Sequence, residues 1–295
     1  MMKSGFVAIL GRPNVGKSTL LNGLINHNVS IVTDKSQTTR NNIIGIYNDE
    51  NTQIVFLDTP GIHKPKAQLG QEMNNMAYSA AHDVDVAMLV VDASKPFGDG
   101  DNYIIEHLDI HHCPLIIVFN KIDLARLDKT EELKKTYRSF FKDALFIDAV
   151  AKEGFNIDEI IKTVSSLLPE GPAYYPPEMI TDKDEIFRIK EIIREKVLKT
   201  LREEVPHSVA IYMEHIEWEK KPLSILASII VEKESQKGIV IGKGGQRIKE
   251  IGSKARQSIE RLLNQHVYLE LKVKVDEDWR NAPSSLKEYG YKYEK

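Results

Sequence analysis

A short glycine-containing stretch near the N-terminus carries the most specific chemistry in the sequence. Residues 11–18 place Gly11 and Gly16 on either side of four residues, followed directly by Lys17 and Ser18. In loops of this pattern the backbone N–H groups converge on phosphate oxygens, and the helix that follows adds its positive dipole end. Lys17 would reach the β- and γ-phosphates of a nucleotide, and the Ser18 hydroxyl would ligate Mg²⁺. The pattern predicts a nucleotide-phosphate site, and the alternative is a glycine-rich tight turn.

A carboxylate follows an apolar run further along the chain. Asp58 directly follows the apolar run at residues 54–57 and begins the sequence Asp58-Thr59-Pro60-Gly61. A phosphate-loop enzyme needs a carboxylate near its metal, and Asp58 could hold Mg²⁺ through water. The glycine would let a backbone N–H approach the γ-phosphate. The alternative interpretation is a simple Pro-Gly turn.

The sequence Asn120-Lys121-Ile122-Asp123 indicates which base is bound. A carboxylate at Asp123 can accept hydrogen bonds from N1–H and the exocyclic amine of guanine, and adenine offers neither donor there. A site built around such bonds rejects the analogue that lacks them by about 10⁴-fold or more. Asn120 would contact the base or brace the loop, and the stem of Lys121 would cover the ring. The alternative is an exposed polar turn after a strand.

A second glycine loop lies in the last third of the chain. Its two glycines, Gly242 and Gly245, are separated by Lys243 and Gly244, and an amphipathic helix with a basic face follows. This is the arrangement of KH domains, in which the loop clamps the backbone of single-stranded nucleic acid. The alternative is a turn between two helices with a solvated basic face. The RNA-binding candidates are Gly242, Lys243, Gly244, Gly245, Arg247 and Lys249.

The elements that must position the first three motifs alternate along residues 1–168. Apolar runs at 6–10, 43–47, 54–57, 86–91, 115–119 and 145–147 predict strands, and amphipathic stretches at 18–25, 71–81, 101–111, 130–141 and 157–167 predict helices. This alternation is typical of an α/β domain with a mostly parallel sheet and helices on both faces. Ligands in that architecture bind beyond the carboxyl ends of the strands.

A proline-rich segment, residues 169–182, is predicted to be a linker. After it, residues 183–295 predict the order helix, strand, strand, helix, helix, strand, a smaller α+β domain of the type II KH fold. The strands are expected at 208–216, 223–232 and 267–275, and the last alternates apolar and polar residues as a half-buried strand does.

Composition limits the classes that remain. The chain has 295 residues, 42% hydrophobic and 28% charged, and a single cysteine, Cys113, so an intrachain disulfide is excluded and a reducing cytosol is expected. No apolar run reaches the ~18 residues that span a membrane, and no signal peptide is recognised. Residues 1–182 carry a net charge of −7 and residues 183–295 one of +4, which together give the −3 of the chain. This asymmetry suggests that only the second part meets a polyanionic partner, and the alternative is that the difference is scatter.

The three nucleotide motifs, in this order, resemble the translation-factor-like GTPases. The resemblance implies that Thr39 ligates Mg²⁺ in the GTP state and that Asn14 helps to bind K⁺ near the phosphates. It also implies base contacts from the loop of Ala151 and Lys152, although Val150 replaces the usual serine. Ile62 stands where Ras-like proteins carry the glutamine that orients the attacking water, and an isoleucine cannot do this.

We therefore expect slow intrinsic hydrolysis, helped by K⁺ or by a partner. The nearby Arg12 and Arg40 are interpreted as solvated rather than catalytic. The catalytic candidates are Lys17, Thr39, Asp58 and Gly61, and the metal ligands are Ser18, Thr39, Asp58 and, for K⁺, Asn14. The nucleotide-binding candidates are Gly11, Arg12, Pro13, Asn14, Val15, Gly16, Lys17, Ser18, Thr19, Asp58, Thr59, Pro60, Gly61, Ile62, Asn120, Lys121, Ile122, Asp123, Ala151 and Lys152.

A GTPase domain followed by a short linker and a C-terminal KH domain resembles the bacterial Era family, and the sequence at residues 202–208 is similar to the second domain of that family. The resemblance implies GTP and GDP as ligands, binding to the 3′ end of 16S ribosomal RNA, and a role in 30S subunit assembly. It also implies a cytoplasmic protein that associates in part with the cytoplasmic face of the cell membrane. We expect the protein to be a monomer. Two other classes stay open: an RNA chaperone regulated by nucleotide with little hydrolysis, and a small-molecule kinase.

Overall fold

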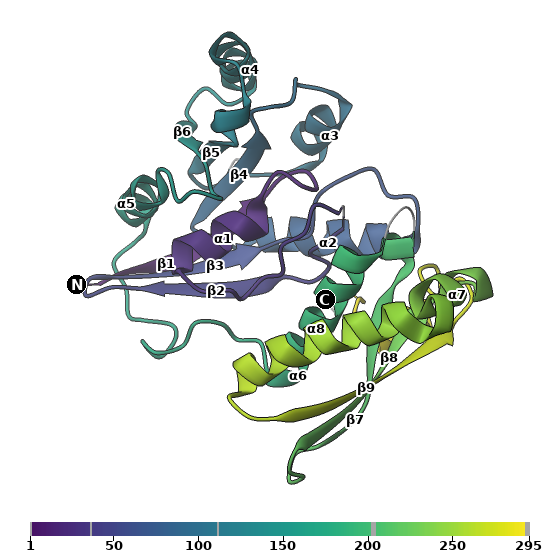
Figure 1. Ribbon diagram of the computed structural model, residues 1–295. Coiled ribbons are helices and arrows are strands. Elements are labelled where there is room, and N and C mark those ends of the chain that lie inside the picture. The colour runs from purple at the N-terminus through teal and green to yellow at the C-terminus, as the bar shows by residue number, and fades with distance from the viewer. Residues whose placement is uncertain (1, 36, 111, 202–204, 293–295) are drawn as a thin grey trace.

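The protein is built around two separate β-sheets, a larger one in the N-terminal part and a smaller one in the C-terminal part (Figure 1). The computed structural model describes residues 2–35, 37–110, 112–201 and 205–292. The predicted motif at residues 202–208 thus lies partly outside the described residues. Among those that are described, no helix combines the length and the apolar composition needed to cross a bilayer.

The first sheet has the strand order β2-β3-β1-β4-β5-β6, and β2 is the antiparallel edge strand of an otherwise parallel sheet. Its central strands are continuous apolar runs because a parallel sheet is buried on both faces. The strands are β1 (Lys3–Leu10), β2 (Ile43–Asn48), β3 (Thr52–Asp58), β4 (Val86–Asp92), β5 (Leu115–Asn120) and β6 (Leu145–Ala149). The parallel sheet predicted from the sequence is confirmed, and the nucleotide motifs follow β1, β3, β5 and β6.

Helices cover both faces of this sheet. One face packs against α1 (Lys17–Ile25) and α5 (Ile157–Leu167). The other packs against α2 (Gln68–His82), α3 (Asp99–His107) and α4 (Leu127–Phe140). The helix predicted over residues 101–111 ends earlier, at His107. The backbone of Leu108 is extended, and Leu108 and Ile110 are buried in the core of that face.

The predicted linker lies along the edge of the first sheet. The side-chain oxygen of Gln53 in β3 accepts the N–H groups of Tyr174 and Tyr175, and Ile46 in β2 donates its N–H to the carbonyl oxygen of Ile180. These bonds fix the path of the chain between the two sheets. The domain boundaries after residues 168 and 182 stay a prediction.

The second sheet has the order β7-β8-β9, with β7 (Ala210–Glu217) antiparallel and β9 (Val267–Val275) parallel to β8 (Leu223–Val231). Its core joins the sheet to α6 (Glu185–Thr200), α7 (Glu234–Ile241) and α8 (Gln246–Leu263). This confirms the predicted order of helices and strands. In β9, buried or partly buried positions alternate with exposed ones, as the sequence predicted.

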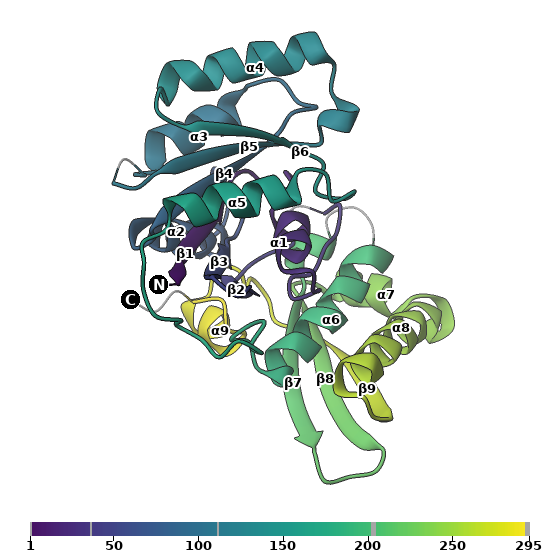
Figure 2. The same ribbon diagram turned by 90° about the vertical axis from the view of Figure 1, so that its left-hand side faces the viewer.

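A C-terminal segment fills the space between the two parts (Figure 2). Trp279, Leu286, Tyr289 and Tyr291 pack with α2 of the first part and with β7 and β8 of the second. The segment includes a helix, α9 (Pro283–Glu288), that the sequence pattern did not indicate. The two parts therefore share an apolar interface that includes a fully buried tryptophan.

Candidate functional site

The loop between β1 and α1 has a backbone that only glycine fits at two positions. Gly11 has φ of 141°, and a Cβ there would lie 2.4 Å from the carbonyl oxygen of Val90. Gly16 has φ of 101°, and a Cβ there would lie 2.3 Å from Nδ2 of Asn120. A larger residue at either position would displace the loop from β4 or from Asn120. The loop leads directly into the N-terminus of α1 at Lys17, the arrangement that binds phosphate.

The Lys17 ammonium group is held inside this loop. Its Nζ donates hydrogen bonds to the carbonyl oxygens of Gly11, at 3.1 Å, and Arg12, at 3.0 Å. Burial lowers the pKa of Lys17 to about 8, although the charge of Asp58 opposes the shift. Burial disfavours the charged ammonium group even with Asp58 nearby, so a phosphate bound beside Lys17 would stabilise that charge.

Three of the predicted metal ligands lie together beside the loop. Oδ2 of Asp58 accepts hydrogen bonds from Ser18 Oγ at 2.7 Å and from Thr39 Oγ1 at 3.4 Å, and the two hydroxyl oxygens lie 2.8 Å apart. Oδ1 of Asp58 is buried and has no hydrogen-bond partner among the described residues. Burial raises the pKa of this carboxyl, although Lys17 and the hydroxyl groups, including that of Ser30, oppose the shift. A buried carboxylate with an unpaired oxygen beside two hydroxyls fits Mg²⁺, which prefers oxygen ligands.

Asn120 connects two loops of the site. Its Nδ2 donates to the carbonyl oxygen of Val15 at 2.8 Å, and its Oδ1 accepts the N–H of Ala151 at 2.9 Å. Of the two roles that the sequence left open for Asn120, its geometry is that of bracing the phosphate loop. The N–H of Ala151, a candidate for contact with the base, is engaged by this side chain.

Lys121 makes a second connection. Its Nζ donates to the carbonyl oxygen of Asn14 at 2.6 Å and to Oδ2 of Asp92 at 2.7 Å. Although burial opposes the shift, hydrogen bonds from Lys121 and Ser94 hold the pKa of Asp92 below its ordinary value. Because β4 and β5 end side by side, this ion pair places the stem of Lys121 at the edge of the site.

Asp123 lies in a short 3₁₀ turn directly after β5, and its side chain is exposed. Lys152 is also exposed and follows β6, the strand next to β5. The residues predicted to hold the base are therefore on adjacent loops at the same edge of the sheet as the phosphate loop. An accessible carboxylate at that place can accept two hydrogen bonds from guanine.

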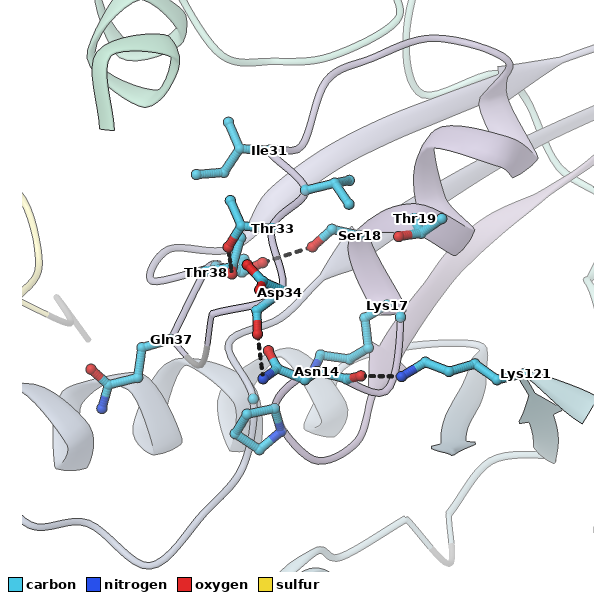
Figure 3. A pocket seen from close by; sticks show the side chains of 15 residues that line it. Asn14, Lys17, Ser18, Thr19, Ile31, Thr33, Asp34, Gln37, Thr38 and Lys121 are labelled. Carbon is cyan, nitrogen blue, oxygen red and sulfur yellow. Dashed lines mark hydrogen bonds between the residues drawn. The ribbon is translucent and has the colours of Figure 1, made fainter. Parts of the chain in front are cut away.

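A cavity of about 270 Å³ lies over the phosphate loop (Figure 3). Its other wall is the loop between α1 and β2, and the side-chain amide of Asn14 donates to the carbonyl oxygen of Asp34 across it, at 3.1 Å. The lining residues are Pro13, Asn14, Gly16, Lys17, Ser18, Thr19, Ile31, Val32, Thr33, Asp34, Gln37, Thr38, Thr39, Gly61 and Lys121. The structure thus brings candidates from three separate motifs to one cavity.

The second glycine loop lies elsewhere, between α7 and α8 at one end of the second part (Figure 1). Gly242, Gly244 and Gly245 have φ of 72°, 58° and 75°, values that favour glycine. Lys243 and Lys249 are exposed, whereas Nη1 of the exposed Arg247 donates to the carbonyl oxygen of Ile239 at 2.6 Å. The loop and the first turn of α8 therefore present a glycine backbone and cationic side chains on one surface.

Comparison with known proteins gives matches in both parts of the chain. Residues 6–121 match the 50S ribosome-binding GTPase family, and residues 204–280 match the KH domain family. The crystal structure of Era in complex with MgGDPNP and nucleotides 1506–1542 of 16S ribosomal RNA is 40% identical, with a TM-score of 0.95, over 99% of this chain and 100% of that one. A variant of Aquifex aeolicus Era bound to GDP·AlF₄⁻ is 41% identical, with a TM-score of 0.94, over the same shares. The chain belongs to the Era family of GTPases.

In this Era-family GTPase, the residue after Gly61 is a core residue. Ile62 is fully buried among apolar side chains of the sheet, and its N–H donates to the carbonyl oxygen of Gly11 at 3.1 Å. Its side chain therefore anchors the loop that carries Gly61. An apolar, buried side chain has no group with which to orient water.

The interpretation of Arg40 as solvated is wrong. Its side chain is 1% exposed and donates to the carbonyl oxygens of Val209, at 2.6 Å, and His207, at 3.0 Å. The guanidinium also lies over the rings of Trp279 and Tyr291, 5.7 and 5.3 Å from their centroids. Carbonyl acceptors and aromatic faces replace water around the charge, which makes burial tolerable.

Arg12 differs from Arg40 in its exposure. Its side chain is 39% exposed and Nη1 pairs with Oδ2 of Asp101 at 2.9 Å.

Other residues at the site had no sequence motif to indicate them. Ser30 donates to Asp58 at 2.7 Å, and Asp92 pairs with Lys121. A lone serine or aspartate has no spacing pattern, so only the folded chain brings these residues to the site.

Proposed function

We propose that this GTPase is a Mg²⁺-dependent switch that binds the 3′ end of 16S ribosomal RNA through its second part and assists maturation of the 30S subunit. The observation that carries the proposal is the presence of both devices in one chain: a phosphate loop with its metal ligands, and an exposed glycine loop before a basic helix. Full-length likeness to Era crystallised with MgGDPNP and a 16S segment supports it.

The nucleotide site distinguishes GTP from GDP by the negative charge of the γ-phosphate. Lys17 meets the phosphates, and the hydroxyls of Ser18 and Thr39 with the carboxylate of Asp58 would hold Mg²⁺, which neutralises phosphate oxygens during transfer. Only glycine fits at position 61, because a Cβ there would lie 2.7 Å from backbone atoms of Pro13. This close approach lets the Gly61 loop lie against the phosphate loop.

The identity of the base is tested through Asp123. Asp123→Asn replaces an acceptor of guanine by a group that pairs with xanthine, so the preferred triphosphate should change from GTP to XTP. Competition binding with GTP, XTP and ATP measures this. Unchanged GTP preference would contradict the role of Asp123, and a preference of the wild type for ATP would favour a kinase.

RNA binding is tested with a single-stranded RNA that carries the 3′ end of the 16S molecule. At one fixed salt concentration, the affinity should differ between the GDPNP-bound and GDP-bound protein. Lys243→Ala should weaken binding in both states and reduce the salt slope by about one. Lys142→Ala, an exposed lysine of the first part, is the matched control. Equal affinities in both nucleotide states would contradict a switch.

Slow intrinsic hydrolysis belongs to the same proposal, because Ile62 offers no group to the attacking water. K⁺ bound with the help of Asn14 is the proposed aid, and replacing K⁺ by Na⁺ in a phosphate-release assay should lower the rate. The same rate in both salts would exclude the cation. Phosphate release also separates a working enzyme from a nucleotide-regulated RNA chaperone.

The location and assembly state are proposed on family resemblance alone. We propose a cytoplasmic monomer that associates in part with the inner face of the membrane. Flotation with anionic vesicles tests the association, and sedimentation tests the monomer. Retention of all protein below the vesicles would contradict a membrane role without affecting the RNA proposal.

A further inference from the structure

The loop that delivers Thr39 to the metal ligands is held by the second part of the chain. Arg194 lies in α6, and its guanidinium donates to two carbonyl oxygens of this loop: Nη1 to Gln37 at 3.4 Å and Nη2 to Thr38. These are the two residues that directly precede Thr39. The guanidinium thus binds the backbone of the loop, not its side chains.

Arg194 is itself held in place. Glu191, one turn earlier in α6, accepts its Nε at 2.8 Å and its Nη2 at 2.6 Å, the two-point pairing that fixes a guanidinium plane. The Arg194 side chain is 1% exposed, and Glu191 is 12% exposed. A buried, doubly anchored arginine is a rigid donor, because water cannot replace its partners.

The residue after Thr39 is held by hydrogen bonds that run the other way, from this loop to the second part. Arg40 directly follows Thr39, and its side chain donates to the carbonyl oxygens of His207 and Val209 in the second part. Residues 37–40 are therefore bracketed: the second part holds the backbone before Thr39 and receives the side chain after it. Between these anchors, the Thr39 hydroxyl lies within hydrogen-bond distance of Ser18 and Asp58.

We propose that Arg194 is a positioning residue for the GTPase reaction, through which the second part of the chain holds Thr39 beside Ser18 and Asp58. The proposal deepens the proposed function, on which it rests, by naming the contact that couples the two parts. It assigns the nucleotide site a component from outside the GTPase domain. The same contact means that movement of α6 must move the backbone at Thr38.

The test compares binding of fluorescent GDPNP and GDP in Mg²⁺ with the full-length chain. Thr39 is needed only with a γ-phosphate, so Arg194→Ala should raise the Kd of GDPNP about tenfold, the worth of one charge-assisted hydrogen bond. The Kd of GDP should stay within about twofold and thereby report that the site is folded. The Mg²⁺ concentration needed for half-maximal GDPNP binding should rise as well.

Two further variants separate positioning from general docking. Arg194→Lys keeps the charge and should restore part of the loss. Asn281→Ala removes a different contact between the two parts, in which Oδ1 accepts the N–H of Gln68 in α2 at 3.1 Å. We expect its Kd for GDPNP to stay within about twofold of the wild type.

Each other outcome counts against the inference. An unchanged ratio of the two Kd values in Arg194→Ala, an equal loss of both ligands, or the same change in Asn281→Ala would each overturn it. Failure of the proposed function has a different signature. If wild-type protein binds RNA equally in both nucleotide states, the switch is excluded, while the Kd ratio still reports on Arg194.

Discussion

Asn120→Ala should destabilise the nucleotide-free protein, even though Asn120 lies in the motif that is predicted to recognise the base. The side chain is 2% exposed, and its two hydrogen bonds join the carbonyl oxygen of Val15 to the N–H of Ala151. Truncation leaves both backbone groups buried without this partner. Each orphaned group costs about 1–3 kcal/mol, so with two such groups the free energy of unfolding should fall by about 2–6 kcal/mol.

Asp123→Ala is the matched control, because its side chain is exposed in the same motif. Its free energy of unfolding should change by less than about 0.5 kcal/mol, while its affinity for guanine nucleotides falls strongly. The two variants should therefore show opposite signatures in two measurements. Urea unfolding of nucleotide-free protein gives the stability, and titration with fluorescent GDP gives the affinity.

One result would refute the bracing role of Asn120. If Asn120→Ala unfolds at the same urea concentration as the wild type and loses only nucleotide affinity, the side chain acts on the base. Hydrogen exchange at the amide of Ala151 adds a local measurement. Exchange should become faster in Asn120→Ala and stay unchanged in Asp123→Ala, since the side chain of Asn120 accepts that N–H.

Three other perturbations test the site. Burial lowers the pKa of Lys17 to about 8, and a bound phosphate should raise it because it stabilises the ammonium form. GDP affinity should therefore be constant below pH 8 and fall by up to about tenfold per pH unit above pH 8. An unchanged affinity from pH 7 to 9 would contradict this prediction. Arg40→Ala should lower the free energy of unfolding in urea by about 3 kcal/mol or more, because Arg40 is fully buried. Arg12 is partly exposed, and its buried partner Asp101 keeps hydrogen bonds from Gly98 and Tyr137, so Arg12→Ala should cost less, about 1 kcal/mol. Equal losses in the two variants would contradict the role of burial at Arg40. Gly61→Ala forces a Cβ to within 2.7 Å of Pro13 backbone atoms, so GDPNP should be lost more than GDP in binding assays, and an equal affinity for both would show that the loops can separate freely.

The parts of the fold that depend on local pattern were predictable. A parallel strand is buried on both faces, so β4 and β5 appear in the sequence as continuous apolar runs. The phosphate loop was predictable for a related reason: its glycines are required by the backbone itself, at Gly11 and Gly16. Each of these two signals is contained in a few consecutive residues of the chain.

The contacts between the two parts were not predictable in this way. Arg40 stands among polar residues, as a solvated side chain would, and its burial depends on carbonyl groups at His207 and Val209. The C-terminal helix α9 is short, and Leu286 is buried only because α2 and the second sheet meet there. Burial that arises from segments far apart in sequence leaves no periodic pattern in either segment.

Ile62 and Arg194 both bear on the timing of GTP hydrolysis. The buried Ile62 has no group that could orient water, so hydrolysis in the GTPase domain lacks that aid at the position after Gly61. The backbone before Thr39 is instead bonded to Arg194 in the second part. If Arg194 positions Thr39, anything that shifts α6 shifts a metal ligand by the same contact. A ligand on the second part could then change the hydrolysis rate without touching the nucleotide, because both sites bias the placement of one loop.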